Sequence, residues 1–247
     1  MAEGLVYTVA VTSCGRHDLL RRTLRSLVAT LDLPPREIVV FEDGGDPGAR
    51  AAAEGLDAPI RVILAEGRLG QMRAIDRLYA EIGTPWAFHC EDDWEFTRTG
   101  YVAESHAVLA ARPEVSTVSL RPIGELNPLI RDTPETVAGG VRCHLLDPAR
   151  HPEYFSYTFN PGLRRLSDLH ALGPLAAIGG EADVSLAFKR RGFRYAVLAE
   201  PAVRHVGWER HVDDPAGLSR PRTPWARWAR SARKRVRRLR RRFSDDA

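Results

Sequence analysis

Three consecutive carboxylates, Glu91, Asp92 and Asp93, follow an apolar run that covers residues 86–90. Like charges at the end of a buried strand repel one another, so they need a counterion. A hard divalent cation prefers oxygen ligands of this kind, and it would neutralise the charge of a leaving diphosphate as a Lewis acid. The cluster therefore predicts a site for Mn²⁺ or Mg²⁺. The alternative is that the three residues only cap a helix or occupy a solvated turn.

The elements around this cluster alternate between strands and helices. Apolar and β-branched runs predict strands over residues 5–12, 37–41, 60–64, 86–90, 115–120 and 195–198. Apolar residues at helical spacing and helix-forming composition predict helices over residues 18–31, 48–55, 69–82, 100–111 and 181–191. Residues 121–180 are rich in Pro and Gly and are predicted to be irregular. The alternation predicts an α/β fold with an open, mostly parallel, Rossmann-like sheet flanked by helices.

Polar side chains stand where ligands bind in such a sheet. The carboxyl ends of the predicted strands carry Thr12, Ser13, Asp43, Asp92 and Asp93. Ligands of open parallel sheets bind at these ends. Arg68 and Arg73 flank the helix before the acidic cluster, and a guanidinium group there could pair with a diphosphate. A solvated helix surface is the alternative for both arginines.

The charge of the chain is divided unevenly along its length. The 247 residues carry a net +4, but the twelve Arg or Lys and two Asp of residues 220–247 contribute +10, which leaves −6 for residues 1–219. An acidic body is a poor platform for nucleic acid, so nucleic acid is not an expected partner. Three widely spaced cysteines argue against a disulfide framework or a zinc site. With no signal peptide or membrane-spanning run recognised, we expect a cytoplasmic location.

Four motifs occur in a fixed order along the chain. They are Thr-Ser-Cys-Gly-Arg at 12–16, Glu-Asp-Gly-Gly at 42–45, Phe-His-Cys-Glu-Asp-Asp-Trp-Glu-Phe at 88–96 and Gly-Gly-Glu-Ala-Asp-Val-Ser-Leu at 179–186. Their order resembles that of the GT-A type glycosyltransferases, closest to glycosyltransferase family 2. The Glu-Asp-Asp-Trp-Glu-Phe segment is also similar to the family that adds N-acetylglucosamine to mannose. The resemblance covers residues 5–208.

This resemblance implies a function as well as a fold. A GT-A enzyme of this kind would be a metal-dependent, inverting glycosyltransferase. Its donor would be a nucleotide sugar, most often a UDP-sugar. The sugar would pass to a hydroxyl group of a glycan, a lipid-linked acceptor or a small molecule.

The resemblance also assigns residues to the donor. In the family's Asp-x-Asp motif, the position of Asp93 ligates the metal, and that of Glu91 faces the ribose or the water shell of the metal. Many relatives have Asp where this chain has Glu91. Asp43 corresponds to the residue that hydrogen-bonds the base, although an Asp before two glycines is also an ordinary turn residue. The residues implied to bind the nucleotide sugar are Thr12, Ser13, Arg16, Asp43, Arg68, Arg73, Glu91, Asp92 and Trp208.

The catalytic residues follow from the same comparison. Aligning the fourth motif places Glu181 on the catalytic base, which takes the proton of the acceptor hydroxyl, and Asp183 on a second acid. Gly180 stands where the family has its first acid, and acidic residues at a helix start that favour the helix dipole are the alternative. His205 is implied to complete the metal site, since a neutral imidazole suits Mn²⁺. Trp208 would close over the donor or the acceptor, or pack in the core.

The composition changes sharply near residue 218, which predicts a GT-A domain over residues 1–218 and a basic tail over residues 219–247. Apolar residues of the tail recur at steps of three or four, at Trp225, Trp228, Ala229, Ala232, Val236, Leu239 and Phe243. Arg and Lys fill the positions between them, which is typical of an amphipathic helix that lies on a membrane surface. Anionic lipids attract such a helix by about 1 kcal/mol per basic residue. We therefore expect peripheral attachment to the inner face of the cell membrane, against the alternatives of a solvated tail or RNA binding.

Two other functions compete with this interpretation. A non-catalytic binding or scaffold protein on a degenerate glycosyltransferase fold would explain the missing acid at Gly180. A sugar-1-phosphate nucleotidyltransferase shares the sheet type. That enzyme needs a glycine-rich loop after the first strand, whereas this chain has the single Gly15 there.

Overall fold

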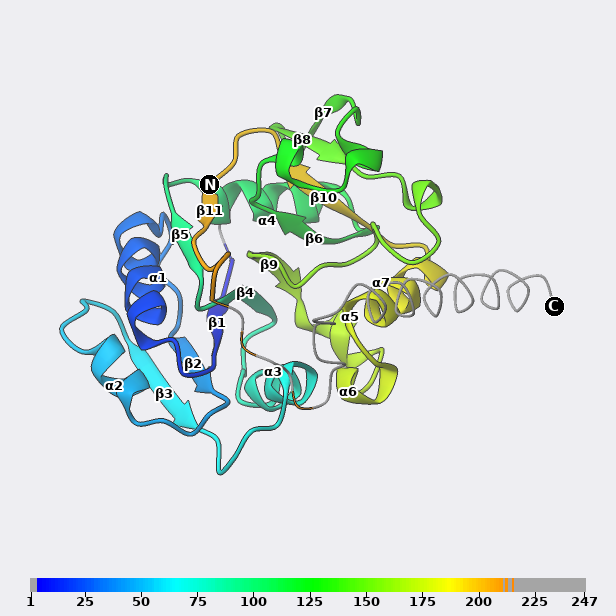
Figure 1. Cartoon of the computed structure of the whole chain (residues 1–247). Helices are drawn as coiled ribbons and strands as arrows, with labels where there is room; N and C mark the ends of the chain where they lie inside the picture. The colour runs from blue at the N-terminus through cyan, green and yellow to red at the C-terminus, as the bar shows by residue number, and fades with distance from the viewer. Residues whose placement is uncertain (1–3, 211, 213–214, 216–247) are drawn as a thin grey trace.

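The structure is a computed structural model that describes residues 4–210, 212 and 215. Within these residues, the main sheet has nine strands in the order β3-β2-β1-β4-β9-β6-β10-β8-β7 (Figure 1). Their bounds are β1 Tyr7–Ser13, β2 Ile38–Glu42, β3 Ile60–Leu64, β4 Trp86–Glu91, β6 Val115–Ser119, β7 Glu135–Ala138, β8 Val141–Leu145, β9 Gly162–Arg165 and β10 Arg194–Leu198. Strands β8 and β9 run against the direction of the others. The predicted open, mostly parallel α/β sheet is confirmed.

Helices cover both faces of the sheet (Figure 1). One face packs against α1 (His17–Thr30), α2 (Gly48–Ala53) and α4 (Tyr101–Ala111). The other face packs against α3 (Gln71–Ala80), α5 (Leu166–His170), α6 (Leu175–Ile178) and α7 (Glu181–Arg190). The core therefore forms two layers, one on each side of the strands.

Local patterning explains these elements. In β1, Val9 and Val11 face the first layer and Ala10 faces the second, and all three are fully buried. In α1, Leu20, Leu24 and Leu27 are fully buried at helical spacing, whereas arginines fill the outer positions. Burying a side chain of this size contributes about 1.5–3 kcal/mol. The strands and helices predicted before residue 120 are present, with bounds that shift by a few residues.

Residues 121–180, for which the sequence predicted little regular structure, contain several short elements. This region forms the hairpin of β7 and β8, strand β9, and helices α5 and α6. Strand β9 lies between β4 and β6 and pairs antiparallel with both. Its four residues include two arginines, which hide the strand in the sequence. Gly162 is required there, because a Cβ at this position would lie 2.1 Å from the carbonyl oxygen of Val118.

A buried arginine side chain stabilises the centre of the second layer. Arg164 on β9 is fully buried, and its Nη1 donates to the hydroxyl of Tyr157 over 2.7 Å. Its Nη2 donates to the carbonyl of Asn160 over 3.0 Å. Nearby, the Tyr79 hydroxyl lies 3.1 Å from Nδ1 of His89. Hydroxyl and carbonyl oxygens thus solvate this guanidinium group inside the protein.

Two further strands lie outside the main sheet. Strand β5 (Trp94–Phe96) pairs antiparallel with β11 (Val203–His205), so that Trp94 stands opposite His205. This ladder carries the chain back from β10 to the residues that follow β4 (Figure 1). Neither strand was predicted, because each has only three residues.

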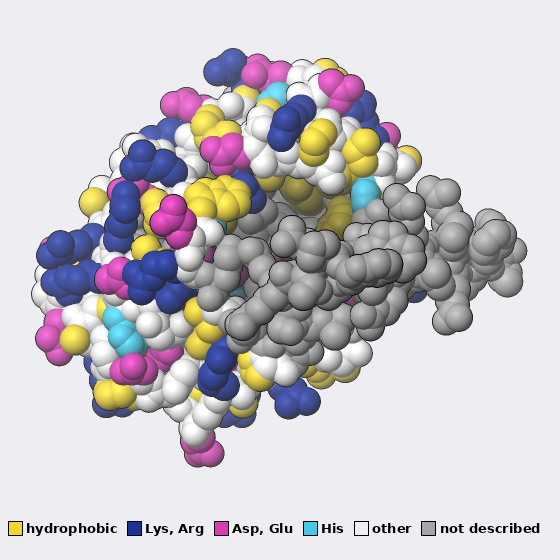
Figure 2. Space-filling view, in the orientation of Figure 1, with side chains coloured by type: hydrophobic (Ala, Val, Ile, Leu, Met, Phe, Trp, Pro, Cys, Tyr) yellow, Lys and Arg dark blue, Asp and Glu magenta, His cyan; other side chains and the backbone are white. Residues whose placement is uncertain are grey.

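Basic and acidic side chains are interspersed over α1 and α2 on the face seen in Figure 2. Among the described residues, no helix has both the length and the apolar character needed to cross a membrane. The boundary predicted near residue 218 and the amphipathic helix predicted over 219–247 lie outside the described residues.

Candidate active site

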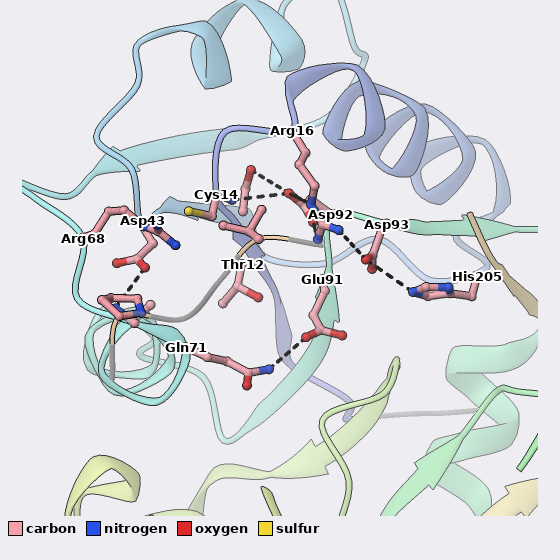
Figure 3. Close-up of a pocket in the computed structure, with 15 residues that line it drawn as sticks. Thr12, Cys14, Arg16, Asp43, Arg68, Gln71, Glu91, Asp92, Asp93 and His205 are labelled. Atoms are coloured by element: carbon pink, nitrogen blue, oxygen red, sulfur yellow. Dashed lines mark hydrogen bonds and ion pairs between the residues drawn. The ribbon is translucent and has the colours of Figure 1, made fainter. Parts of the chain in front are cut away.

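A pocket of about 310 Å³ opens at the carboxyl ends of β1, β2 and β4 (Figure 3). Its volume is at the lower end of the range typical of ligand sites. Most of the predicted site residues meet in it. Those that line it are Thr12, Ser13, Arg16, Asp43, Arg68, Glu91, Asp92, Asp93 and His205. The fold therefore brings these residues together in one pocket, and their roles stay predictions.

Asp92 fastens the loop that follows β1. Its Oδ2 accepts hydrogen bonds from the Ser13 hydroxyl over 3.2 Å and from the Cys14 amide over 3.3 Å. Its Oδ1 forms an ion pair with Nη2 of Arg16. Burial raises the pKa of Asp92 to about 6, although Arg16 lowers it. These contacts occupy both oxygens, so Asp92 shapes the wall of the pocket.

Asp93 faces the pocket from the same turn. Its Oδ2 lies 2.8 Å from Nη1 of Arg16 and 3.3 Å from Nε2 of His205. Its Oδ1 is buried and has no hydrogen-bond partner in the described part of the chain. The amide of Val206 donates to the Asp93 carbonyl over 2.9 Å, which fixes the end of β11 beside the acidic turn. The short ladder of β5 and β11 therefore brings His205 to Asp93 (Figure 3).

His205 is held as a neutral imidazole. Burial lowers its pKa below the ordinary value, and the opposing effect of Asp93 is smaller. The ring makes edge contacts with Trp94, at 4.8 Å between centroids, and with Trp208, at 4.4 Å. A neutral imidazole and a neighbouring carboxylate are both suitable ligands for Mn²⁺.

The candidate metal ligands fit a divalent cation only in part. Asp93 Oδ1 and the imidazole of His205 are suitable ligands, and Glu91 lines the same pocket. Across residues 4–210, 212 and 215, however, no group of three His, Cys, Asp or Glu side chains converges as a metal site. Mg²⁺ commonly binds through one or two carboxylates, with phosphate oxygens and water completing its shell. The residues present fit a cation that arrives with a diphosphate.

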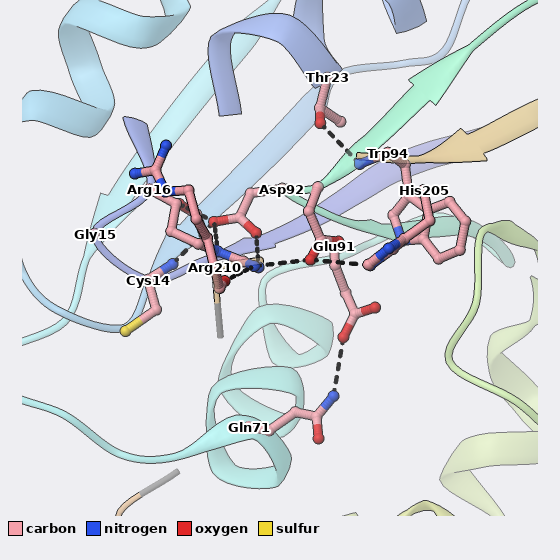
Figure 4. Close-up of polar contacts among 12 residues, drawn as sticks. Cys14, Gly15, Arg16, Thr23, Gln71, Glu91, Asp92, Trp94, His205 and Arg210 are labelled. Atoms are coloured by element: carbon pink, nitrogen blue, oxygen red, sulfur yellow. Dashed lines mark hydrogen bonds and ion pairs between the residues drawn. The ribbon is translucent and has the colours of Figure 1, made fainter. Parts of the chain in front are cut away.

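Glu91 points away from Arg16, towards α3 (Figure 4). Its Oε1 accepts a hydrogen bond of 3.0 Å from Nε2 of Gln71, the first residue of α3. Burial raises the pKa of Glu91 to about 8, and the like charges of Asp93 and Glu181 add to the effect. Glu91 therefore lies between Asp93, the candidate metal ligand, and Glu181.

Asp43 joins two loops of the pocket. Its Oδ1 accepts from the Leu69 amide over 2.7 Å, and its Oδ2 accepts from the Gly70 amide over 3.0 Å. These bonds hold the loop that carries Arg68 (Figure 3). A carboxylate has about four acceptor positions, so each oxygen can still accept a bond from a nucleotide base.

The predicted catalytic pair lies outside the pocket lining. Oε1 of Glu181 accepts from the Thr158 hydroxyl over 2.8 Å and from the Phe159 amide over 3.2 Å. Asp183, the third residue of α7, accepts from the Gly180 amide over 3.1 Å, and it lies at the helix start as the helix-dipole alternative expects. The carboxylate of Asp183 is therefore engaged at the start of α7, and Glu181 is the better placed of the two to act as the base.

Two other predicted donor residues also lie outside the lining. Arg73 is exposed on α3. Trp208 is 62% exposed, and its contact is with the ring of His205.

Sequence reasoning missed three residues of the site. Gln71 and Cys14 line the pocket; Cys14 lies inside the first motif but was given no role, and no motif included Gln71. Glu42 is fully buried, and its Oε1 accepts from the amides of Gly15, over 2.9 Å, and Gly44, over 3.0 Å. An acidic residue closing a buried strand was the available signal for Glu42.

Such a sheet, with carboxylates leaving β4 into a pocket beside β1 and β2, has the arrangement of the GT-A fold. Residues 8–121, which contain the first three of the four motifs, match the family model described as Glycosyl transferase family 2, in agreement with the resemblance to that family. The family match and the fold together support a glycosyltransferase. No curated protein matches the chain significantly by sequence.

Solved structures share the fold at low sequence identity. A mannosyltransferase from Pyrobaculum calidifontis, in complex with GDP-Man and Mn²⁺, superposes with a TM-score of 0.60 at 16% identity, covering 83% of this chain and 57% of its own. S. aureus TarS 1-349, in complex with UDP-GlcNAc, gives 0.57 at 14% identity, covering 84% and 62%. GalNAc-T7, with UDP, GalNAc and Mn²⁺, gives 0.58 at 14% identity, covering 82% and 44%. The chain thus spans less than two thirds of the length of each of these proteins.

Proposed function

We propose that the chain is a metal-dependent, inverting glycosyltransferase that moves a sugar from a nucleotide sugar to an acceptor hydroxyl. One observation carries this proposal: Asp93, with its unpartnered oxygen, and His205 meet in the pocket that Asp43 and Arg68 also line. A cation bound there would supply Lewis-acid neutralisation of the leaving nucleoside diphosphate. Proteins of similar fold are described with Mn²⁺ and with GDP-Man, UDP or UDP-GlcNAc, which supports a nucleotide-sugar donor.

The chain's own residues divide the work between donor and acceptor. Asp43 would orient the base and Arg68 would pair with the diphosphate. Glu181 would take the proton of the acceptor hydroxyl as the oxygen attacks the anomeric carbon. Its hydrogen bonds from Thr158 and Phe159 leave Oε2 available for that proton. We propose a UDP-sugar as donor, and a glycan, a lipid-linked molecule or a small molecule as acceptor.

A thermal-shift screen of UDP, GDP and dTDP, with and without Mn²⁺, tests the donor side. The expected result is a rise in melting temperature for one nucleotide that is larger with Mn²⁺. The matching nucleotide sugar should then be hydrolysed slowly, and Asp93→Asn should reduce this turnover by at least about 100-fold. No nucleotide response and no turnover with any donor would contradict the proposal.

The non-catalytic alternative rests on two observations: Gly180 replaces an acid, and Glu181 does not line the pocket. A scaffold would bind nucleotide and metal without cleaving the donor. Turnover that depends on Asp93 separates the two functions.

The membrane hypothesis for residues 219–247 rests on the sequence alone. We propose that the tail attaches the protein to anionic lipid, which would place membrane-proximal acceptors within reach. Sedimentation with anionic liposomes, for the full chain and for a chain ending at residue 218, tests the idea. Equal pelleting of both forms would rule it out.

A further inference from the structure

The guanidinium group of Arg16 lies between the side chains of Asp92 and Asp93 (Figure 3). Its Nη1 is 2.8 Å from Asp93 Oδ2, and its Nε is 3.4 Å from Asp92 Oδ2. Its Nη2 makes an ion pair with Asp92 Oδ1. Only 15% of the Arg16 side chain is exposed, against 1% for Asp92 and 10% for Asp93. The cluster therefore contains its own positive charge in a place that solvent hardly reaches.

Other contacts hold Arg16 in this position. Its Nη1 also donates to the backbone carbonyl of Arg210 over 2.9 Å. The side chain of Arg210 in turn forms an ion pair with Asp18, two residues after Arg16 in the sequence. The guanidinium group is thus bound from the acidic turn on one side and from the chain after β11 on the other.

A divalent cation at Asp93 would meet this fixed charge. Burial alone would lower the pKa of Arg16, but the two aspartates raise it overall, so the group stays charged. A cation near Asp93 would lie within a few ångströms of the guanidinium group, where like charges repel strongly in a partly buried site. The cation and Arg16 therefore compete for the same carboxylate.

Binding of a diphosphate would change the competition between Arg16 and the cation for Asp93. A guanidinium group binds phosphate oxygens in a bidentate manner, and the same pocket is the one proposed for the donor. Arg16 could then leave Asp93 for the diphosphate without losing a counter-charge, and the cation could take its place.

We propose that Arg16 is an internal counterion that competes with the divalent cation for Asp93 and passes to the diphosphate when the donor binds. The inference rests on the proposed function and deepens it, because it makes metal and nucleotide bind cooperatively. Allosteric and linked sites commonly show coupling of about 5- to 150-fold. The protein without nucleotide should accordingly bind Mn²⁺ weakly, and the protein with nucleotide should bind it tightly.

Titration of free Mn²⁺ by electron paramagnetic resonance tests the competition without any turnover. The titration is done with no nucleotide, and again with UDP and with GDP. Removing the competing charge in Arg16→Gln should tighten Mn²⁺ binding in the absence of nucleotide by about 10-fold or more, and should remove most of the enhancement by nucleotide. Arg22→Gln, which removes an exposed arginine paired with Glu95, is the matched control and should behave like the wild type.

A second variant guards against misfolding of the first. Arg16→Lys keeps one charge but loses the planar fork, so it should bind Mn²⁺ with an affinity between those of the wild type and Arg16→Gln. Equal Mn²⁺ affinity for the wild type, Arg16→Gln and Arg16→Lys without nucleotide would overturn the proposal, as would an absence of binding in all three. Should Mn²⁺ affinities be equal while nucleotide still binds and donor is still cleaved, only the role of Arg16 fails, and the proposed function stands.

Discussion

Asp43 and Leu69 are joined by a hydrogen bond of 2.7 Å from the Leu69 amide to Oδ1 of Asp43, and the Gly70 amide binds the other oxygen. This link holds the β3–α3 loop against the end of β2. The carboxylate therefore has a structural task in addition to the base contact proposed for it.

Replacing Asp43 should separate these two tasks. Asp43→Ala removes two charge-assisted hydrogen bonds and should lower the free energy of unfolding by about 2–4 kcal/mol. Asp43→Asn keeps one acceptor oxygen, so it should lose less stability while still weakening nucleotide binding. Urea unfolding and nucleotide titration measure the two effects. Asp57→Ala, at an exposed position, is the control, and equal stability of Asp43→Ala and this control would contradict the structural task.

Glu181 and Asp183 should respond differently to loss of charge. Glu181→Gln should reduce sugar transfer by about 100-fold or more, because general-base catalysis contributes that much, and it should leave nucleotide affinity unchanged. Asp183→Asn should lower stability by about 0.5–2 kcal/mol, because the carboxylate caps α7, and it should retain turnover. Transfer rates and thermal unfolding of both variants decide the assignment. Full transfer activity in Glu181→Gln would exclude Glu181 as the base.

Glu91 should make the metal-free protein less stable as the pH rises. Burial raises the pKa of Glu91 from its ordinary value of 4.5 to about 8 in the folded protein. The folded state therefore holds this proton more tightly than the unfolded state, and stability is lost as the pH rises from 4.5 through about 8. In EDTA, Glu91→Gln should melt at a higher temperature than the wild type at pH 8.5, with a much smaller difference at pH 5. A difference that does not change with pH would count against this shift.

Arg164 should be essential for folding of the second core layer. Arg164→Lys retains the charge but cannot reach both the Tyr157 hydroxyl and the Asn160 carbonyl, so buried oxygens lose their partners. We expect a loss of about 3 kcal/mol in the free energy of unfolding. Arg142→Lys, on the exposed side of β8, provides the comparison. Denaturant unfolding measures both, and a loss below 1 kcal/mol for Arg164→Lys would be contrary to expectation.

The part of the fold before residue 120, which carries the proposed donor site, could be predicted from the sequence because each signal there is local. Runs such as 37–41 and 60–64 are rich in apolar and β-branched residues, which is typical of strands in a parallel sheet. Strand β2 is fully buried at the inside of that sheet, and β3 is half-buried at its edge. The acidic residues after Cys90 and the polar residues after Val11 then fall at the same edge. That reasoning was enough to bring Asp93, Asp43 and Thr12 into one pocket.

The rest depends on contacts between distant segments. Strand β9 has an alternation that Arg164 and Arg165 conceal, because arginine is rarely buried and Arg164 becomes so only through partners elsewhere in the chain. Likewise, the resemblance places Arg16 among the residues that bind the nucleotide sugar, and its ion pairs with Asp92 and Asp93 appear only in three dimensions. Short strands such as β5 and β11 carry too few residues for a periodic pattern.

The position of β9 has a consequence for how the chain can be divided. The segment that matches the family model ends at residue 121, two residues beyond β6, yet β9 comes later in the chain and fills the space between β4 and β6. A fragment cut at that point would leave both of those strands with open, apolar edges, which invite aggregation. Residues 8–121 therefore do not form an independent folding unit. The sheet is complete only when β9, from later in the chain, pairs with both β4 and β6.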